Sequence, residues 1–253
     1  MRILITGTNR GIGLELTRQY AAAGHEIVAT CRDVEGASAL RELARREPGV
    51  LPCRLDVTDE GSIKDLAAAL ESEHRGIDLL INNAAFYGRS SGRLPAVDPV
   101  DWTAMFQVNT MGPLLVSRAL LPALRRGINP KVVAISSVKA SMTRNTLGAS
   151  YQYRATKAGL NATMRSLAVD LRDEGVGVYV LSPGWVDQGE DFGAPEDFGD
   201  RLRRARVMRR EFGEGCARQT LPESVTRLRE VIAALEPERS GGFYDHVGEP
   251  LEW

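Results

Sequence analysis

Short apolar runs alternate with longer segments of helical periodicity along the whole chain. The first run, Arg2–Thr6, leads through a glycine-rich turn into a segment at 14–21 whose apolar residues recur at helical spacing. Six further runs have the length and composition of strands: residues 26–30, 50–55, 78–82, 131–136, 177–181 and 242–244. Helical segments fall near residues 35–47, 59–74, 101–126, 151–174 and 222–235. This alternation predicts an α/β fold with a single, doubly wound parallel sheet and helices on both faces, in one domain over residues 1–253.

One segment, residues 184–220, departs from this pattern. It is rich in Gly, Asp, Glu and Arg and contains the basic stretch 201–210. One interpretation is a mobile, solvated insertion with one charged helix. The other is a lid that closes over a substrate, because loops of this kind often determine specificity. The two interpretations are compatible, and we expect a substrate lid here.

Composition narrows the class of protein. A chain of 253 residues is long enough to bury a substantial core, and its net charge of −1 gives no bulk attraction to nucleic acid or to an anionic membrane. The N-terminal residues lack the features of a signal peptide, and no apolar run approaches membrane-spanning length. Cys31, Cys53 and Cys216 show no metal-ligand spacing. We therefore expect reduced thiols, no metal site and a cytoplasmic location.

The glycine-rich turn at the first predicted strand is a candidate anion site. Gly7, Gly11 and Gly13 lie between a strand and a helix N-terminus, where glycines let the backbone approach a pyrophosphate and the helix N–H groups favour its charge. The spacing is G-x-x-x-G-x-G rather than the more common G-x-G-x-x-G. An ordinary strand-to-helix turn is the alternative. The flanking strand and helix favour nucleotide binding, as in Rossmann-type folds.

A tyrosine and a lysine four residues apart form the second candidate site. On a helix Tyr153 and Lys157 project from one face, and a nearby cation lowers the pKa of a phenol and suits it to proton transfer. The spacing alone also fits a solvated helix face. Only four of the 32 basic residues are lysines, so a lysine kept at this position favours the functional interpretation.

With these motifs in order, the chain resembles the short-chain dehydrogenase/reductase family over nearly its full length. The matching segments are 6–13, which resembles the cofactor turn; 55–58, which resembles the adenine-binding stretch; 82–85, similar to Asn-Asn-Ala-Gly with Ala85 in place of Gly; 108–109; 135–137; the pair Tyr153 and Lys157; and 182–186, which resembles the nicotinamide-side turn. No single motif is decisive, but seven in the family's order are strong evidence for the resemblance.

The resemblance implies a catalytic role for four residues. Tyr153 would be the general acid, Ser137 would hydrogen-bond the substrate oxygen, and Lys157 would lower the pKa of Tyr153 and hold the nicotinamide ribose. Asn109 would orient a water molecule for the proton relay. By motif position we prefer Ser137 to Ser136.

Two further side chains compete for these roles. Because the stretch between Ser137 and Tyr153 is longer than in many relatives, Ser141 remains an alternative to Ser137. Tyr151 is not expected to be the general acid, because no lysine lies four residues after it.

The resemblance also implies the cofactor-binding set. These residues surround the glycine turn, the end of the second strand, the adenine-binding stretch and the nicotinamide-side turn: Gly7, Asn9, Arg10, Gly11, Ile12, Gly13, Arg32, Asp56, Val57, Asn83, Ala84, Tyr153, Lys157, Pro183, Gly184 and Val186. Where the family usually has a carboxamide-binding Thr, this chain has Gln188, whose side chain can also hydrogen-bond an amide.

The choice between NADP(H) and NAD(H) depends on the end of the second predicted strand. NAD-specific relatives have an Asp there, whereas this chain has Cys31 followed by Arg32, with Arg10 inside the glycine turn. Two guanidinium groups suit a 2′-phosphate, so we favour NADP(H). If Asp33 filled the slot instead, NAD(H) would be the cofactor. In so Arg-rich a chain, both could also be ordinary surface arginines.

Within the family the chain looks closest to the carbonyl-reductase-like group that includes the C-factor and sniffer proteins, through residues 151–157, residues 240–244 and Trp253. The implied function is an NADPH-dependent carbonyl reductase acting on a small carbonyl or alcohol. A nucleotide-binding sensor or signalling protein with little turnover is the alternative. Relatives often pair through their two long helices, here near 101–126 and 151–174, so a homodimer or homotetramer is expected.

Overall fold

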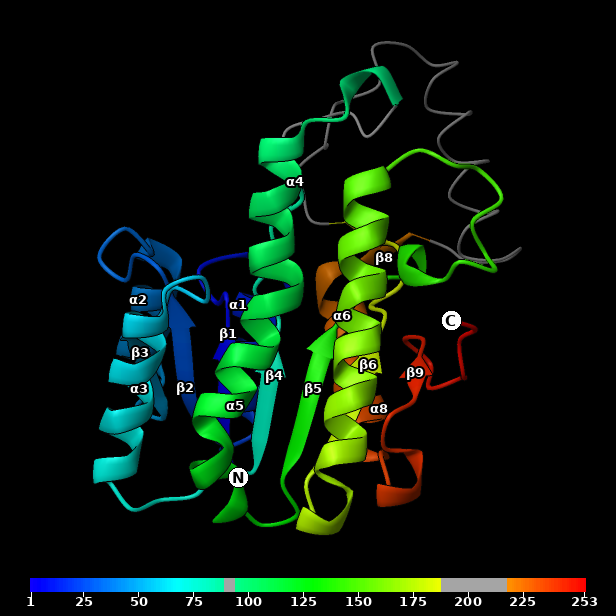
Figure 1. Ribbon diagram of the computed structural model, residues 1–253. Coiled ribbons are helices and arrows are strands. Elements are labelled where there is room, and N and C mark those ends of the chain that lie inside the picture. Colours follow the sequence, from blue (N-terminus) through cyan, green and yellow to red (C-terminus); the bar gives the residue numbers. More distant parts are fainter. Residues whose placement is uncertain (89–93, 188–217) are drawn as a thin grey trace.

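A seven-stranded parallel sheet forms the centre of the computed structural model, which describes residues 1–88, 94–187 and 218–253 (Figure 1). The strands follow the order β3-β2-β1-β4-β5-β6-β9, and every neighbouring pair is parallel. Their bounds are β1 Arg2–Thr6, β2 Glu26–Cys31, β3 Val50–Arg54, β4 Leu79–Asn82, β5 Lys131–Ile135, β6 Gly177–Leu181 and β9 Phe243–Tyr244. The predicted doubly wound α/β fold is confirmed.

Helices cover both faces of this sheet (Figure 1). The helices on one face are α1 (Gly11–Ala22), α2 (Ser38–Arg46) and α8 (Leu221–Ala233), and those on the other are α3 (Glu60–Ser72), α5 (Gly112–Arg125) and α6 (Tyr151–Asp170). Alternate residues of each strand point to opposite faces. In β1, for example, Leu4 packs into the core under α3, α5 and α6, while Ile3 and Ile5 pack into the core under α1, α2 and α8.

The predicted helix at 101–126 differs in detail from the structure. It begins earlier, as α4 (Pro99–Phe106), and passes through a π-helical segment, Gln107–Met111, before α5. The side chain of Asp98 caps α4 by accepting a hydrogen bond from the N–H of Val100. A π-helical turn inserts one extra residue without ending the helix, so the apolar pattern gave no sign of it.

The charged segment predicted as a substrate lid at 184–220 lies mostly outside the described residues, as do Gln188 and Cys216. Its two ends are described, and they pair as the short parallel strands β7 (Val186–Asp187) and β8 (Gln219–Thr220). The lid therefore stays a prediction.

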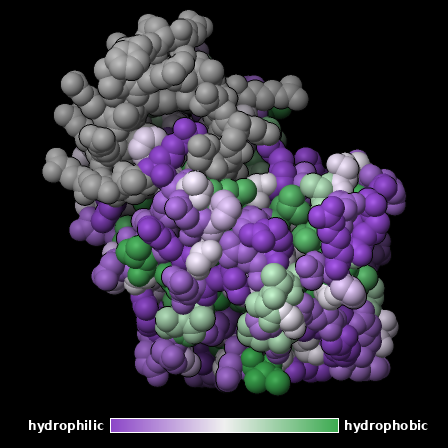
Figure 2. Space-filling model, turned by 180° about the vertical axis from the view of Figure 1, so that it is seen from behind, coloured by the Kyte–Doolittle hydropathy of each residue, from purple (hydrophilic) through white to green (hydrophobic). Residues whose placement is uncertain are grey.

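Two kinds of feature are absent from the described residues. Within 1–88, 94–187 and 218–253 no helix is long and apolar enough to cross a membrane. The same residues contain no cluster of His, Cys, Asp and Glu side chains that could hold a metal ion. Cys31 and Cys53 are free thiols. Seen from behind the sheet, the described surface is mostly hydrophilic, with apolar side chains in small separate groups (Figure 2).

Candidate active site

The site predicted from sequence lies at the carboxyl ends of the central strands. Ser137 follows β5, Asn109 lies in the π-helical segment, and Tyr153 and Lys157 lie in the first turns of α6. Since parallel strands deliver their following loops to one edge of the sheet, residues far apart in sequence meet there. The structure brings all four predicted catalytic residues into this region.

Ser137 and Tyr153 are joined directly. The Ser137 hydroxyl is hydrogen-bonded to the Tyr153 phenol, and its Oγ also accepts a hydrogen bond of 3.2 Å from the N–H of Lys139. The neighbouring Ser136 hydroxyl is buried and donates to Oδ1 of Asn161 at 2.6 Å. Successive residues of an extended chain point in opposite directions, so only Ser137 faces the phenol.

Ser141 is directed elsewhere. Its hydroxyl donates to the carbonyl oxygen of Trp253 at 3.5 Å and accepts from the N–H of Arg144 at 3.2 Å. It is 1% exposed, and it helps to attach the C-terminus to the loop before α6. Tyr151, the other tyrosine considered, is exposed at the start of α6. The geometry therefore favours Ser137 and Tyr153 over both alternatives.

Lys157 is almost completely buried, with 2% of its surface exposed. Its Nζ donates a hydrogen bond of 2.8 Å to the carbonyl oxygen of Ile135 and lies 5.9 Å from the centre of the Tyr153 ring. Burial lowers the pKa of this ammonium to about 8, because the charged form loses its hydration.

The pKa of Tyr153 differs from the sequence-based expectation. Burial raises this pKa above its ordinary value and the nearby Tyr87 raises it further, whereas the hydrogen bond with Ser137 acts in the opposite direction. Lys157 does not lower this pKa, because burial brings the pKa of Lys157 itself to about 8, and its side chain is uncharged at the pH where the phenol would ionise. Tyr153 is thus a protonated phenol at neutral pH, the form that a proton donor needs.

Asn109 connects the π-helical segment to the loop after β4. Its Oδ1 accepts a hydrogen bond of 2.8 Å from the N–H of Phe86, and its Nδ2 donates to the carbonyl oxygen of Phe86 at 2.8 Å and to Oγ1 of Thr156 at 3.2 Å. Its side chain is 1% exposed. The side chain therefore fixes the backbone of this loop, and its expected role in orienting water stays a prediction.

The glycine turn has the backbone that its sequence predicts. Gly7 and Gly11 have φ values of 71° and 58°, in the left-handed region that favours glycine. A Cβ on Gly7 would lie 2.8 Å from the Cα of Ala84, and one on Gly13 would overlap the carbonyl oxygen of Gly7. The turn therefore has no room for a side chain at these two positions. Ile12, by contrast, packs into the core, so it can offer only its backbone to a ligand.

The Asn83 and Ala84 pair braces this turn. Nδ2 of Asn83 donates to the carbonyl oxygens of Thr6 and Gly7 at 2.9 and 3.1 Å. The backbone N–H groups of Asn83 and Ala84 both donate to Oγ1 of Thr6, at 3.0 and 2.9 Å. Both residues were predicted as cofactor contacts, and the structure shows what their polar groups do within the protein.

Strand β2 extends one residue beyond the predicted strand at 26–30. The strand ends at Cys31, so Arg32 is the first residue beyond it, and both Arg32 and Asp33 are exposed. Oδ1 of Asp33 accepts a hydrogen bond of 2.9 Å from the N–H of Gly36, which directs this carboxylate into its own turn. The arrangement favours Arg32 over Asp33 as the residue facing the adenine ribose.

Asp56 lies beside two guanidinium groups. Burial acts to raise the pKa of this carboxyl, but hydrogen bonds from Thr58 and the charges of Arg32 and Arg54 bring it below its usual value. Arg54 ends β3 and is paired with Cys31 in the sheet register. The sequence analysis missed Arg54, although its place at the end of the adjacent strand could have indicated it.

The nicotinamide-side turn is held by hydrogen bonds from α8 and β8. The hydroxyl of Ser224, in α8, donates to the carbonyl oxygen of Pro183 at 2.9 Å, and Gly184 has a φ of 80°. The N–H of Gln219 donates to the carbonyl oxygen of Trp185 at 2.8 Å, next to β7 and its residue Val186. These contacts attach the turn to α8.

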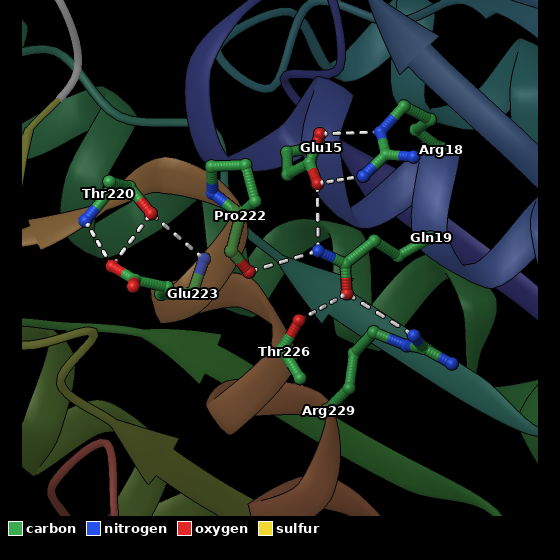
Figure 3. A network of polar contacts seen from close by, with 8 residues as sticks. All are labelled: Glu15, Arg18, Gln19, Thr220, Pro222, Glu223, Thr226 and Arg229. Carbon is green, nitrogen blue, oxygen red and sulfur yellow. Dashed lines mark hydrogen bonds and ion pairs between the residues drawn. The ribbon is translucent and has the colours of Figure 1, made fainter.

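Helix α8 is in turn held against α1 by a network centred on Gln19 (Figure 3). Nε2 of Gln19 donates to Glu15 at 2.7 Å and to the carbonyl oxygen of Pro222 at 3.1 Å, while its Oε1 accepts from Thr226 and Arg229 at 3.2 Å each. The helix that begins at the glycine turn thereby supports the helix behind the nicotinamide-side turn.

Gln219 is a second buried glutamine, and it differs from Gln19 in its hydrogen bonding. Its side chain is 5% exposed, and neither of its amide atoms has a hydrogen-bond partner in the described part of the chain. Its Nε2 lies against Gly184, 2.7 Å from where a Cβ would be. An unpartnered buried carboxamide is costly. Nothing in the sequence indicated this residue, because its burial depends on the pairing of β7 with β8.

Comparison with known proteins identifies the family of this chain. A family model described as short chain dehydrogenase matches residues 1–191. The chain belongs to this family, which confirms the predicted oxidoreductase class.

Two curated relatives and one solved structure illustrate the similarity. The C-signal protein of Myxococcus xanthus is 37% identical over 177 residues, which cover 70% of this chain and 93% of that protein. A 1-hydroxy-2-glutathionyl-2-methyl-3-butene dehydrogenase of Rhodococcus sp. (strain AD45) is 30% identical and covers 99% of both chains. Among solved structures, an NADPH-bound carbonyl reductase from chicken fatty liver has a TM-score of 0.84 and 32% identity, covering 100% of this chain and 98% of the other.

Proposed function

We propose that this protein is an NADPH-dependent carbonyl reductase, which converts an aldehyde or ketone to the alcohol. The observation that carries the proposal is the hydrogen-bonded pair of Ser137 and Tyr153, with the buried Lys157 four residues further along α6. These groups lie at the same sheet edge as a glycine turn able to accept a dinucleotide. The carbonyl reductase names among the structural neighbours support the same reaction.

The residues around the glycine turn fit a dinucleotide. A side chain at Gly7 or Gly13 would collide with neighbouring backbone, and Gly11 has a φ of 58°. Within the described residues no side chain caps the first turn of α1 and no acidic residue lies in it. Unsatisfied N–H groups and the helix dipole favour a pyrophosphate at such a place. Asn9 and Arg10 are exposed beside the turn.

The remaining predicted contacts would position the rest of the cofactor. Asp56 and Val57 would hold the adenine, Pro183, Gly184 and Val186 would line the nicotinamide side, and Lys157 would bind the ribose. When bound, the nicotinamide supplies the hydride that reduces the substrate carbon.

The protein's own groups would handle the oxygen of the substrate. Tyr153 would donate its proton as negative charge develops on that oxygen, and Ser137 would donate a second hydrogen bond to it. The raised pKa keeps Tyr153 protonated at neutral pH. Asn109 would keep the loop after β4 in place, so that the substrate meets these groups in a fixed geometry.

The preference for NADPH over NADH rests on Arg10 and Arg32. Arg32 follows the end of β2 directly, and Asp33 is bound into a turn two residues past the strand. A 2′-phosphate beside Arg32 would form charge-assisted hydrogen bonds, which are stronger than neutral ones. Neighbouring solved structures with bound NADP support this assignment.

The test is consumption of NADPH by the purified protein with a panel of aldehydes, aromatic ketones, keto esters and quinones, together with detection of the alcohol product. We expect turnover of at least one class. Tyr153→Phe should reduce kcat by at least about a hundredfold while NADPH binding stays close to wild type. Tyr151→Phe, on the same helix, is the matched control and should keep full activity.

The named relative C-signal favours a second candidate, a nucleotide-binding sensor or signalling protein with little turnover. The same panel separates the two functions. NADPH binding without reduction of any carbonyl would support the sensor, and a Tyr153→Phe variant would then behave like the wild type.

A homodimer or homotetramer is also proposed, formed through α4, α5 and α6. Phe106, Met111 and Val169 on these helices and the π-helical segment are 39%, 47% and 49% exposed, which is high for large apolar side chains. Sedimentation velocity of the wild type and of a Phe106→Glu, Met111→Glu variant tests it, and a monomeric wild type would contradict it. The cytoplasmic location stays a prediction, consistent with the free thiols of Cys31 and Cys53.

A further inference from the structure

The ring of Tyr87 lies against the ring of Tyr153. Their centroids are 4.5 Å apart and their planes are inclined by 43°, within the range of favourable aromatic contacts. Tyr87 is 37% exposed. Its ring therefore uses part of its surface to contact the proposed general acid and leaves another part accessible beside it.

The fold fixes the backbone on both sides of Tyr87. Phe86, which precedes it, has both its N–H and its carbonyl oxygen hydrogen-bonded to the buried side chain of Asn109. Gly88, which follows, has a φ of 82°, and a Cβ there would overlap the side chains of Asp101 and Met105. A ring whose neighbours are held in this way is pre-organised, so little conformational entropy is lost when a ligand packs on it.

A carbonyl oxygen in reach of both Ser137 and Tyr153 places the rest of the substrate next to Tyr87. We propose that Tyr87 is a substrate-binding residue of this reductase, whose ring selects carbonyl groups conjugated to an aromatic ring. The inference rests on the proposed function and names its substrate class. A flat aromatic substituent can stack offset on an exposed phenol ring, and such pairs are worth more than the area they bury. A saturated ring of equal size gains only the free energy of burying its apolar surface.

The influence of Tyr87 on the phenol of Tyr153 agrees with this placement. Tyr87 contributes to the raised pKa of Tyr153, as expected for two phenols whose rings are in contact. The substrate oxygen would therefore approach a phenol that already has an aromatic neighbour.

The experiment compares two ketones of similar size, acetophenone and cyclohexyl methyl ketone. The ratio of their kcat/KM values is measured in wild type, Tyr87→Leu and Tyr87→Phe. Intrinsic differences in reactivity cancel when the ratio is compared between variants. Tyr87→Leu should lower the acetophenone preference about fivefold, because it removes the ring, whereas Tyr87→Phe should keep the preference. Tyr151→Leu is the matched control and should leave it unchanged.

Binding of the same two ketones to the protein saturated with NADP⁺, measured by calorimetry, gives a readout without turnover. A fall of about fivefold in the acetophenone preference in Tyr87→Leu supports the inference even if no ketone is reduced, in which case only the proposed reductase function fails. A preference that Tyr87→Leu leaves unchanged, or equal loss in Tyr87→Leu and Tyr87→Phe, overturns the role of the ring. Absence of binding by both ketones to wild type overturns it as well.

Discussion

The ammonium of Lys157 donates a hydrogen bond of 2.8 Å to the carbonyl oxygen of Ile135, the last residue of β5. The ammonium of the predicted catalytic lysine is therefore attached to the central sheet. A buried ammonium with a single described hydrogen bond is poorly solvated, and burial lowers its pKa to about 8. This site is thus maintained at a cost in stability, as functional sites commonly are.

The cost can be measured through its dependence on pH. The folded protein releases the Lys157 proton near pH 8, whereas the unfolded chain keeps its lysine proton to about pH 10.4. Between these values the unfolded state binds more protons, so wild-type stability should rise with pH. Lys157→Met removes the group. It should increase the free energy of unfolding at neutral pH by on the order of 2 kcal/mol, an advantage that shrinks above about pH 8.

Urea unfolding of the two proteins between about pH 7 and about pH 10 provides this comparison. Lys64→Met is the matched control, because Lys64 is exposed on α3 and its side chain contacts only Glu60 among the described ion pairs. It should change stability little at any pH. If the gain from Lys157→Met were independent of pH, the lowered pKa of Lys157 would be wrong.

Adjacent serines should behave differently because their hydroxyls face different ways. Ser137→Ala removes a hydrogen bond to Tyr153 and the proposed donor to the substrate oxygen, so kcat should fall about a hundredfold with a small effect on NADPH binding. Ser136→Ala leaves Oδ1 of Asn161 without its 2.6 Å hydrogen bond and should lower stability by about 1 kcal/mol while kcat is kept.

Steady-state kinetics and thermal unfolding of both variants, with Ser141→Ala as a third, measure these effects. Ser141 is bonded to Trp253 and Arg144, so its variant should retain kcat. Loss of activity in Ser136→Ala or Ser141→Ala, with Ser137→Ala active, would assign the substrate oxygen to another serine.

Parts of the backbone could be predicted from the sequence, because few residue types favour the conformations concerned. The glycine turn was predictable, since the φ values of 71° and 58° at Gly7 and Gly11 lie in the left-handed region that favours glycine. The end of β2 at Cys31 was predictable from its apolar run to within one residue. Ser137 was predictable from its place after β5, and the structure adds its contact with Tyr153.

Side-chain environments could not be predicted, because they depend on elements distant in sequence. The spacing of Tyr153 and Lys157 correctly put them on one helix, but the direction of the Tyr153 pKa shift is decided by burial. Tyr87 lies in a loop without periodicity, and the hydrogen bonds between Asn109 and Phe86 help to place it at the active site. Local patterns carry no information on such contacts.

Cofactor preference should depend on the two arginines at the adenine end. Arg32→Asp with Arg10→Ala removes donors to a 2′-phosphate and adds a carboxylate that repels it, so the kcat/KM for NADPH relative to NADH should fall more than about tenfold. Direct titration of both nucleotides, followed by their fluorescence, should show the same change in affinity.

Arg46→Ala provides the control for general loss of positive charge. Arg46 pairs with Glu42 on α2 at 2.7 Å and should not affect the preference. A wild type that already prefers NADH, or a double variant with an unchanged ratio, would show that Arg10 and Arg32 do not contact the cofactor.

Two buried glutamines should respond in opposite ways to the same substitution. Gln19 is 8% exposed and has four hydrogen bonds that join α1 to α8 (Figure 3), whereas Gln219 is 5% exposed and its amide atoms have none from the described residues. Gln19→Leu leaves polar partners unsatisfied and should lower the free energy of unfolding by about 1–3 kcal/mol. Gln219→Leu removes a desolvated amide and should raise it by about 1 kcal/mol.

Urea unfolding of the ligand-free variants measures both values under one condition. The pair is informative because the substitution, the residue volume and the burial are nearly the same, so only the hydrogen bonding differs. If Gln219→Leu also destabilises the protein, then the amide of Gln219 is satisfied in solution, by water or by residues of the segment 188–217, and its burial against Gly184 carries no cost.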